Sequence, residues 1–327
     1  MNFELKPFHS RLDSTKIQDS MRCYRYYFYK YILGWVPDRP ELHLDFGRLW
    51  HKSMEHLILN GQSAKSVLDA YEILNKGYRE IFPEESSDSD RAPKTPGTVL
   101  ANLPKYSIFC KSQGDNFRPV YTEIGGSVPI SESNRLYFRM DSILQNLDNG
   151  KYLSLEHKTG SQLSEKWKNN WKLKFQTGTY NHVLHCLYKD EEIEGVYING
   201  AIFTKGRGID YLRVPVRKSV EMLEVWLDQA NYYYSQIELE TAEFEEEIQR
   251  EHFYLVMGCF PQNTESCTDY SGCEYFNFCT AWPNPLRYIE DGPPEGFRQK
   301  FWDPIVGEVD LNGVALKEDK ARKIFEL

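Results

Sequence analysis

The feature that most constrains this chain is the pair Asn149-Gly150, which separates two strand-like runs of sequence. Apolar residues recur in both runs, at 135–144 and 151–158, with the spacing of β-strands. An Asn-Gly pair between such runs is a strong short-range signal for a β-hairpin. We therefore expect the two runs to fold back on each other as neighbouring antiparallel strands.

Helix-like and strand-like segments alternate around this hairpin. Helical periodicity predicts helices at 14–33, 47–57, 64–82, 172–189 and 219–251, and further strands are predicted at 121–130, 195–204 and 211–215. The segment 83–97 is rich in Pro, Ser and acidic residues, which indicates an exposed loop. The alternation predicts an α/β fold in which helices flank one sheet.

Three charged side chains converge if the hairpin forms. Glu156 and Lys158 are two residues apart, so they project from one face of the second strand. The turn brings Asp141 of the first strand beside them, and the backbone carbonyl of His157 is a further candidate ligand. Two carboxylates suit Mg²⁺ or Mn²⁺, which acidify a bound water and polarise a phosphoryl oxygen. The alternative is a surface hairpin with an ordinary Glu–Lys pair.

A local basic and aromatic patch follows the hairpin. The chain as a whole is acidic, with a net charge of −9, so any contact with nucleic acid must be local. Residues 158–174 contain five lysines and one glutamate. Lys166 and Lys168 can hold phosphates, and Trp167 and Trp171 can stack on bases. A solvated loop anchored by the two tryptophans is the alternative.

Four of the seven cysteines, at positions 259, 267, 273 and 279, are close together in the sequence. Turn-forming residues between them allow several thiolates to approach one another, as metal binding requires. The N-terminus lacks a secretory leader, so we expect a reducing compartment in which thiols bind metal or stay free. The C-x-x-C pair of a zinc ribbon is missing, which argues against structural zinc. Unligated thiols are the alternative.

Taken in order, these motifs resemble the PD-(D/E)xK nuclease superfamily. Asp141, Glu156 and Lys158 match its Asp…Glu-x-Lys arrangement, although Met140 stands where the family has Pro. On this resemblance, the two carboxylates hold the metal and the lysine activates the water. The acid Glu123, on the preceding strand, is either a supporting acid or a solvated residue.

Two further motifs resemble the RecB-like and AddB-like branch, which includes the CRISPR-associated exonucleases. Gln176 and Tyr180 match its Q-x-x-x-Y element and lie on one side of a helix. Residues 47–51 match its G-x-x-x-H motif, whose histidine is here His51. The resemblance makes His51 a metal ligand and makes Gln176 and Tyr180 residues that position the scissile strand.

The resemblance also implies a [4Fe-4S] cluster, held by one cysteine before the nuclease core and three after it. Cys23, Cys267, Cys273 and Cys279 occupy those places, although the spacing between the last three is wider than the family's. Cys259 is the competing fourth ligand. Such a cluster would tie the two ends of the chain together.

The resemblance covers about 14–279 and implies a restriction-endonuclease-like core, with a central mixed sheet flanked by helices. We expect a helical N-terminal region at 1–115, with the first cluster cysteine and the histidine motif. A nuclease core at 116–255 and an iron–sulfur subdomain and tail at 256–327 complete the division.

The implied function is a metal-dependent DNA exonuclease for single strands or duplex ends, in recombination, repair, phage or CRISPR-adaptation systems. No G-x-x-x-x-G-K-[ST] loop is present, so unwinding would come from a helicase or recombination partner. No apolar run reaches about 20 residues, so we expect no membrane span. We expect a cytoplasmic or nucleoid location, and an oligomer is compatible with the sequence. The alternatives are a DNA-binding adaptor subunit and a site-specific endonuclease on the same core.

Overall fold

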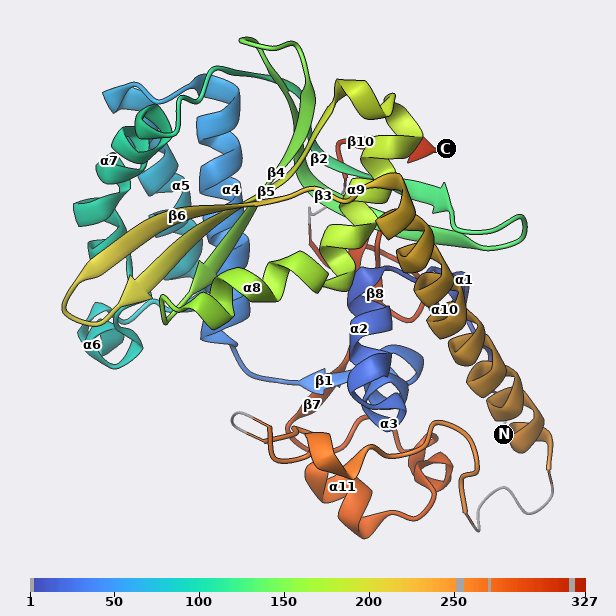
Figure 1. Ribbon diagram of the computed structural model, residues 1–327. Coiled ribbons are helices and arrows are strands. Elements are labelled where there is room, and N and C mark those ends of the chain that lie inside the picture. Colours follow the sequence, from blue (N-terminus) through green and yellow to red (C-terminus); the bar gives the residue numbers. More distant parts are fainter. Residues whose placement is uncertain (1–2, 251–255, 270–271, 318–320) are drawn as a thin grey trace. The chain divides into compact units, whose positions relative to one another are not determined.

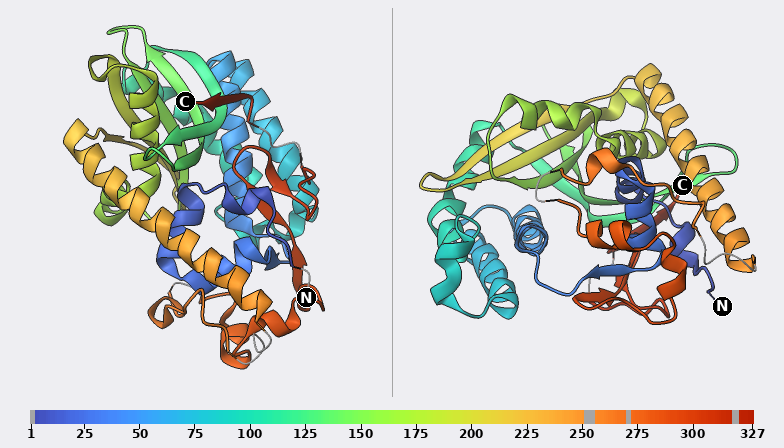
Figure 2. Two further views of the ribbon diagram at one scale, coloured as in Figure 1. Left: turned by 90° about the vertical axis from the view of Figure 1, so that its right-hand side faces the viewer. Right: turned by 90° about the horizontal axis from the view of Figure 1, so that it is seen from below.

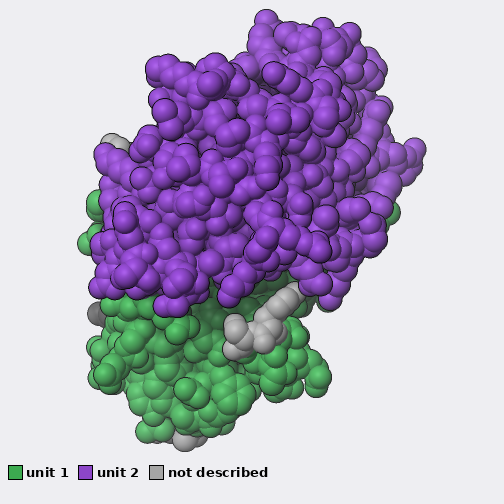
Figure 3. Space-filling view, turned by 90° about the vertical axis from the view of Figure 1, so that its left-hand side faces the viewer, with its two compact units in different colours: residues 1–39, 125–139, 224–327 green, residues 40–124, 140–223 purple. Residues whose placement is uncertain are grey.

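The computed structural model describes residues 3–250, 256–269, 272–317 and 321–327 of the chain (Figure 1). It divides into two compact units, each assembled from separated stretches of sequence (Figure 3). Unit 1 comprises 1–39, 125–139 and 224–327, and unit 2 comprises 40–124 and 140–223. Among the described residues no helix is both long and apolar enough to cross a membrane.

A six-stranded mixed sheet has the strand order β10-β2-β3-β4-β5-β6. Its strands are β2 (Phe117–Pro129), β3 (Arg135–Asn146), β4 (Tyr152–Gly160), β5 (Ile193–Thr204), β6 (Gly208–Val216) and β10 (Lys323–Glu326). β4 and β5 are parallel, whereas β3 with β4 and β5 with β6 are antiparallel. The expected hairpin is confirmed, and Gly150 takes the left-handed conformation in its turn, with φ of 75°. The α/β fold with a restriction-endonuclease-like sheet is confirmed as well.

Unit 2 covers both faces of the sheet with helices (Figure 2). One face carries α4 (Leu42–Asn60), α5 (Ala64–Ile81) and α7 (Pro96–Ser112), and the other carries α8 (Glu165–Leu173) and α9 (Phe175–Leu187). Five consecutive residues of β4, 153–157, are buried, as expected for a strand with both faces covered. The main core of the unit joins α4, α5 and α7 to β5 and β6 through Trp50, Tyr78, Leu103, Phe203 and Ile209 among others.

Two expectations for unit 2 need correction. The segment 83–97 is only partly an exposed loop, because it contains a 3-10 turn (Glu85–Ser87), α6 (Asp88–Arg91) and the start of α7. Lys94, Thr95 and Pro96 are buried there. The helix predicted at 172–189 is α9, which begins only at Phe175, because residues 172–173 end the preceding helix α8 and Lys174 separates the two.

Unit 1 contains the N-terminal helices, the long α10 and the cysteine-rich segment. The predicted helix at 14–33 is interrupted at Cys23, which is extended, with φ of −169° and ψ of 122°. The elements are α1 (Pro7–Ser10), α2 (Ser14–Arg22), α3 (Tyr24–Tyr27), a π-helical turn (Phe28–Ile32), β1 (Trp35–Pro37), α10 (Val220–Gln249), α11 (Phe276–Ala281), β7 (Phe297–Gln299), β8 (Phe301–Asp303) and β9 (Gly307–Val309). Aromatic stacking joins their distant segments, as between Tyr29 and Tyr275, whose ring centroids are 5.0 Å apart.

Candidate functional site

The candidate site lies where β3 and β4 stop pairing through their backbones. The strands are in register at 143–145, opposite 152–154. Ser142, the residue before this stretch of β3, donates from Oγ to the carbonyl oxygen of Leu155 at 2.9 Å. Asp141, which precedes Ser142, accepts the backbone N–H of His157 at its Oδ2, 2.8 Å away. Side chains of β3 thus bond to the backbone of β4 directly beside the residues that pair.

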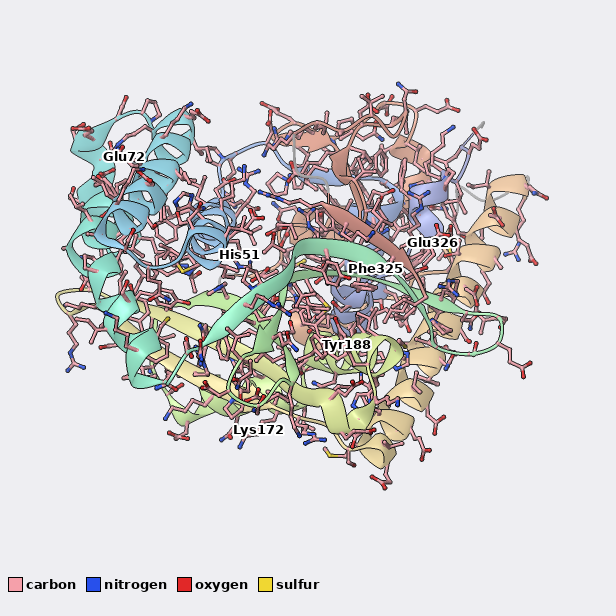
Figure 4. All side chains as sticks on the ribbon, turned by 90° about the horizontal axis from the view of Figure 1, so that it is seen from above. His51, Glu72, Lys172, Tyr188, Phe325 and Glu326 are labelled. Carbon is pink, nitrogen blue, oxygen red and sulfur yellow. The ribbon has the colours of Figure 1, made fainter. Side chains whose placement is uncertain are left out.

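His51 reaches this place from α4. Its Nδ1 lies 2.9 Å from Oδ1 of Asp141, although the two residues are 90 positions apart. Figure 4 shows His51 on the side of α4 that faces the sheet, whereas Glu72 on α5 lies at the outer edge of the helices. Both oxygens of Asp141 thus accept hydrogen bonds, one from the sheet backbone and one from the helix.

Glu156 and Lys158 form the second half of the site, on one face of β4. Lys158 donates from Nζ to Oε1 of Glu156 at 2.6 Å. The glutamate side chain is 2% exposed, and its Oε2 is buried with no hydrogen-bond partner among the described residues. A buried carboxylate oxygen without a donor is costly, so this atom is available to a cation.

The charges of the site act on one another strongly. Burial raises the pKa of Glu156, and the Asp141 carboxylate raises it further. Burial works against ionisation of Asp141 too, but the combined effect of His51, its hydrogen bond and the Lys158 ammonium holds the pKa of Asp141 below its usual range. Burial lowers the pKa of Lys158, but the two carboxylates outweigh it and raise the pKa overall. Perturbed groups gathered in this way mark candidate functional sites.

The donor set suits a hard divalent cation, with two carboxylates and an imidazole. Among the described residues no group of three or more His, Cys, Asp or Glu side chains stands ready in the geometry of a metal site. The candidate ligands instead hydrogen-bond with one another and with Lys158. The unpartnered Oε2 of Glu156 is the atom that fits a bound cation best.

Comparison with known families bears on this geometry directly. The sequence model of the PD-(D/E)XK nuclease superfamily matches residues 12–280, well over half of the chain. The chain belongs to the PD-(D/E)XK nuclease superfamily. Nucleases of this superfamily typically use Mg²⁺ or Mn²⁺, in keeping with the donor set described above. No curated protein matches the chain.

Two solved structures resemble this nuclease distantly. The crystal structure of SSO0001 is 17% identical, with a TM-score of 0.24, and the match covers 57% of this chain and 82% of that one. A protein of Eubacterium rectale to which exonuclease activity has been ascribed is 13% identical, with a TM-score of 0.41 and coverage of 72% and 88%. At these TM-scores neither likeness bears on the activity of the nuclease.

The helix α8 brings the basic and aromatic patch of the nuclease to the sheet. Trp171 lies beside the candidate site, because Nζ of Lys158 is 5.8 Å from its ring centroid. Trp167 packs on the sheet itself, and a Cβ added to Gly200 would stand 2.5 Å from its ring. Lys168 pairs with Glu165 at 2.7 Å, while Lys166 is exposed. Trp167 therefore anchors the helix, and Trp171 is the tryptophan placed near the reactive groups.

The remaining predicted residues of the core are placed as follows. Gln176 donates from Nε2 to the hydroxyl of Tyr180 at 2.7 Å, so the two do share one side of α9. His157 contributes its backbone N–H to Asp141, and its buried ring lies 6.1 Å from that of Tyr106 on α7. Burial lowers the pKa of the His157 imidazole to about 3. The ring is therefore neutral at physiological pH.

Sequence reasoning missed Ser142 and Lys94. Ser142 is buried and bridges β3 to β4, as described above. Lys94 is buried near the end of β4, where its Nζ lies 3.2 Å from Oγ1 of Thr159. No local pattern marks either residue, although the position of Ser142 directly after Asp141 was available as a signal.

Unit 1 gathers four cysteines of the nuclease. Cys23, Cys267 and Cys273 all act electrostatically on the thiol of Cys279, although among the described residues no three cysteines stand together in the geometry of a metal site. Burial raises the pKa of Cys279 to about 11. The backbone N–H of Asn263 donates to Sγ of Cys23 at 3.3 Å, which fixes the N-terminal cysteine beside the C-terminal segment.

Cys259 has different surroundings. Its Sγ lies 3.7 Å from Oε2 of Glu247 on α10, and the residue is fully buried. Burial and the carboxylates of Glu247 and Glu240 raise the pKa of Cys259. A thiol held next to carboxylates is poorly disposed to lose its proton and bind metal.

Proposed function

We propose that the chain is a metal-dependent DNA nuclease, most specifically an exonuclease on single strands or duplex ends. The observation that carries the proposal is the convergence of His51 with Asp141 and of Lys158 with Glu156 at the point where β3 and β4 diverge. Superfamily membership supports phosphodiester hydrolysis as the reaction. We propose His51, Asp141, Glu156 and the carbonyl of His157 as the ligands of Mg²⁺ or Mn²⁺.

The bound ion would acidify the attacking water and offset charge on the phosphate. The chain's own part in the reaction follows from its charges. Because the pKa of Lys158 is raised, the ammonium keeps its proton at neutral pH. It can then donate hydrogen bonds to the attacking water and to the phosphoryl oxygens as negative charge develops on them. We assign to Gln176 and Tyr180 the positioning of the scissile strand.

We assign the contact with the substrate strand beyond the scissile bond to α8. Trp171 presents an aromatic face beside Lys158, on which a base can stack. Lys166 and Lys168 can hold phosphates, and Trp167 fixes the helix that carries them. The absence of a nucleotide-binding loop in the sequence supports a helicase or recombination partner, and the pathway would be recombination, repair or CRISPR adaptation.

We also propose that Cys23, Cys267, Cys273 and Cys279 hold a [4Fe-4S] cluster. The electrostatic action of the other three thiols on Cys279 and the hydrogen bond from Asn263 to Cys23 support this assignment, and the position of Cys259 beside Glu247 disfavours the competing ligand. The cluster would stabilise unit 1 by joining its N-terminal helices to residues 267–279.

The test is digestion of end-labelled single- and double-stranded DNA with Mg²⁺ or Mn²⁺, by the wild type and by Glu156→Ala. Cleavage by the wild type alone supports the nuclease, and the label lost first gives the polarity. Internal cuts would replace the exonuclease by an endonuclease. Absence of cleavage by both proteins, with DNA binding retained, would overturn the proposal in favour of a binding subunit.

A further inference from the structure

Lys94 places a buried ammonium group beside the C-terminal end of β4. Its side chain is 5% exposed, and its Nζ lies 5.8 Å from the ring centroid of Phe46 on α4. The hydroxyl of Thr159 accepts from this Nζ, and within the described residues no carboxylate pairs with it. A buried charge without a counter-charge is destabilising unless an anion supplies one.

α4 runs antiparallel to β4, and this alignment connects Lys94 to the candidate active site. Toward the start of β4, Ile58 packs on the cluster of Leu144, Leu153 and Leu155. Further along, His51 of α4 meets Asp141. At the end of β4, Phe46 lies by Lys94. The helix therefore lies along the strand over the distance from the carboxylates to the buried ammonium.

Three residues of α4 lie in a row over this distance. His43, Gly47 and His51 are four positions apart, so they lie along one side of the helix at intervals of about 6 Å. His51 is bonded to Asp141 at one end. At the other end, burial lowers the pKa of the His43 imidazole, and the charge of Lys94 lowers it further. The row thus carries nitrogen donors at both ends.

Gly47, in the middle of the row, leaves open space. No atom lies within 4 Å of the place where a Cβ would stand on this residue. Glycine inside a helix is less stable than alanine, and the packing of the described residues gives no reason for it here. A strip without a Cβ suits close approach of a ligand backbone.

We propose that Lys94 and His43 form a phosphate subsite for the nucleic-acid strand, reached over the open surface of Gly47. The inference rests on the proposed function, because the strand that it holds is the one cleaved at Asp141 and Glu156. A strand carries a negative charge at every phosphodiester, so a phosphate neighbouring the scissile one supplies the anion that Lys94 lacks. Its non-bridging oxygens would accept from Nζ of Lys94 and from the imidazole of His43.

The test is the binding of a fluorescein-labelled oligothymidylate, followed by anisotropy over a range of salt concentrations in the cleavage-deficient Glu156→Gln background. Lys94→Met should weaken binding about tenfold and lower the salt-dependence slope by about 0.7. It should also raise the melting temperature, because it removes an unpaired buried charge. A lower melting temperature with unchanged binding would make Lys94 a structural residue and overturn the proposal.

Gly47→Ala gives an independent result if Lys94→Met fails to fold. It should weaken binding several-fold without lowering the melting temperature. The matched control is Gly97→Ala on α7, where a Cβ also meets open space, and its binding should not change. Equal binding by both alanine variants would overturn the subsite alone. Absence of binding by the Glu156→Gln protein without a further substitution would overturn the proposed function and the subsite together.

Discussion

The imidazole of His51 and the carboxylate of Asp141 meet at 2.9 Å across 90 residues of sequence. The contact joins α4 to the middle of β3, two residues before the stretch that pairs with β4. Burial lowers the pKa of His51, but the Asp141 carboxylate and its hydrogen bond raise it more. A helix thereby supplies a nitrogen donor to a site otherwise built from one hairpin.

Replacing His51 with alanine should weaken Mn²⁺ binding at least about tenfold, because one ligand of the proposed site is removed. The Mn²⁺ concentration that gives half-maximal DNA cleavage measures this effect. His56→Ala, on the same helix, is the matched control and should behave as the wild type. An unchanged Mn²⁺ requirement in His51→Ala would remove His51 from the ligand set.

Lys158→Ala should lower the cleavage rate by about 10²- to 10³-fold, since the ammonium that donates to the reacting oxygens is lost. Binding of DNA should be largely retained, because this side chain is only one of many basic groups on the unit. Single-turnover cleavage and anisotropy separate the two effects. Lys76→Ala, which changes an exposed lysine on α5, is the control. Full cleavage by Lys158→Ala would exclude the assigned role.

The purified nuclease should be brown and contain iron and labile sulfide. Cys23→Ser and Cys267→Ser should lose the colour and melt at lower temperature, because the cluster links distant segments of unit 1. Cys110→Ser should keep both properties. Cys259→Ser should keep the colour, since the thiol of Cys259 faces Glu247. A colourless Cys259→Ser together with a brown Cys23→Ser would make Cys259 the fourth cluster ligand in place of Cys23.

Unit 1 should lose stability in acid through His9. Burial, with Lys16 and Lys6 nearby, lowers the pKa of His9 from its ordinary value of 6.5 to about 3. Below pH 6.5 the unfolded chain binds a proton at His9 that the folded chain does not bind. The contribution of His9 to the free energy of unfolding is therefore complete above pH 6.5 and declines as the pH falls. The decline is about 1.4 kcal/mol per pH unit within that window. Urea unfolding of the wild type and His9→Phe should show the smaller pH slope in the variant, and equal slopes would contradict the assignment.

Gly200→Ala should destabilise the nuclease by about 1–3 kcal/mol, because the new methyl group meets the ring of Trp167 at 2.5 Å and Leu212 at 2.8 Å. Thermal unfolding measures the effect. In a Trp167→Leu background the added cost of Gly200→Ala should be smaller, since part of the obstacle is gone. An equal cost in both backgrounds would show that Trp167 does not anchor α8 there.

The hairpin and the charged trio could be predicted because their geometry is local. A two-residue spacing on a strand fixes the shared face of Glu156 and Lys158, and the Asn-Gly turn fixes their partner strand. The residues at 176 and 180 share one side of α9 for the same kind of reason. These features depend on backbone periodicity, which neighbouring residues determine.

Burial by distant residues could not be predicted from the sequence in this way. The stretch around Lys94 looks like a loop by composition, but it packs against Thr159, 65 positions later. The break between α8 and α9 at Lys174 is marked by neither Gly nor Pro. It is stabilised by the hydroxyl of Thr177, which donates to the carbonyl oxygens of Trp171 and Lys174 at 2.7 and 2.8 Å.

We propose above all that Glu156 holds the metal that drives hydrolysis. The most direct measurement is cleavage of end-labelled DNA by protein freed of divalent metal and titrated with Mn²⁺, comparing the wild type, Glu156→Gln and the exposed-surface control Glu72→Gln. We expect Mn²⁺ to restore cleavage to the wild type and to Glu72→Gln, and Glu156→Gln to stay inactive at every concentration. Cleavage by Glu156→Gln at the wild-type Mn²⁺ requirement, or wild-type cleavage without added metal, would contradict the claim.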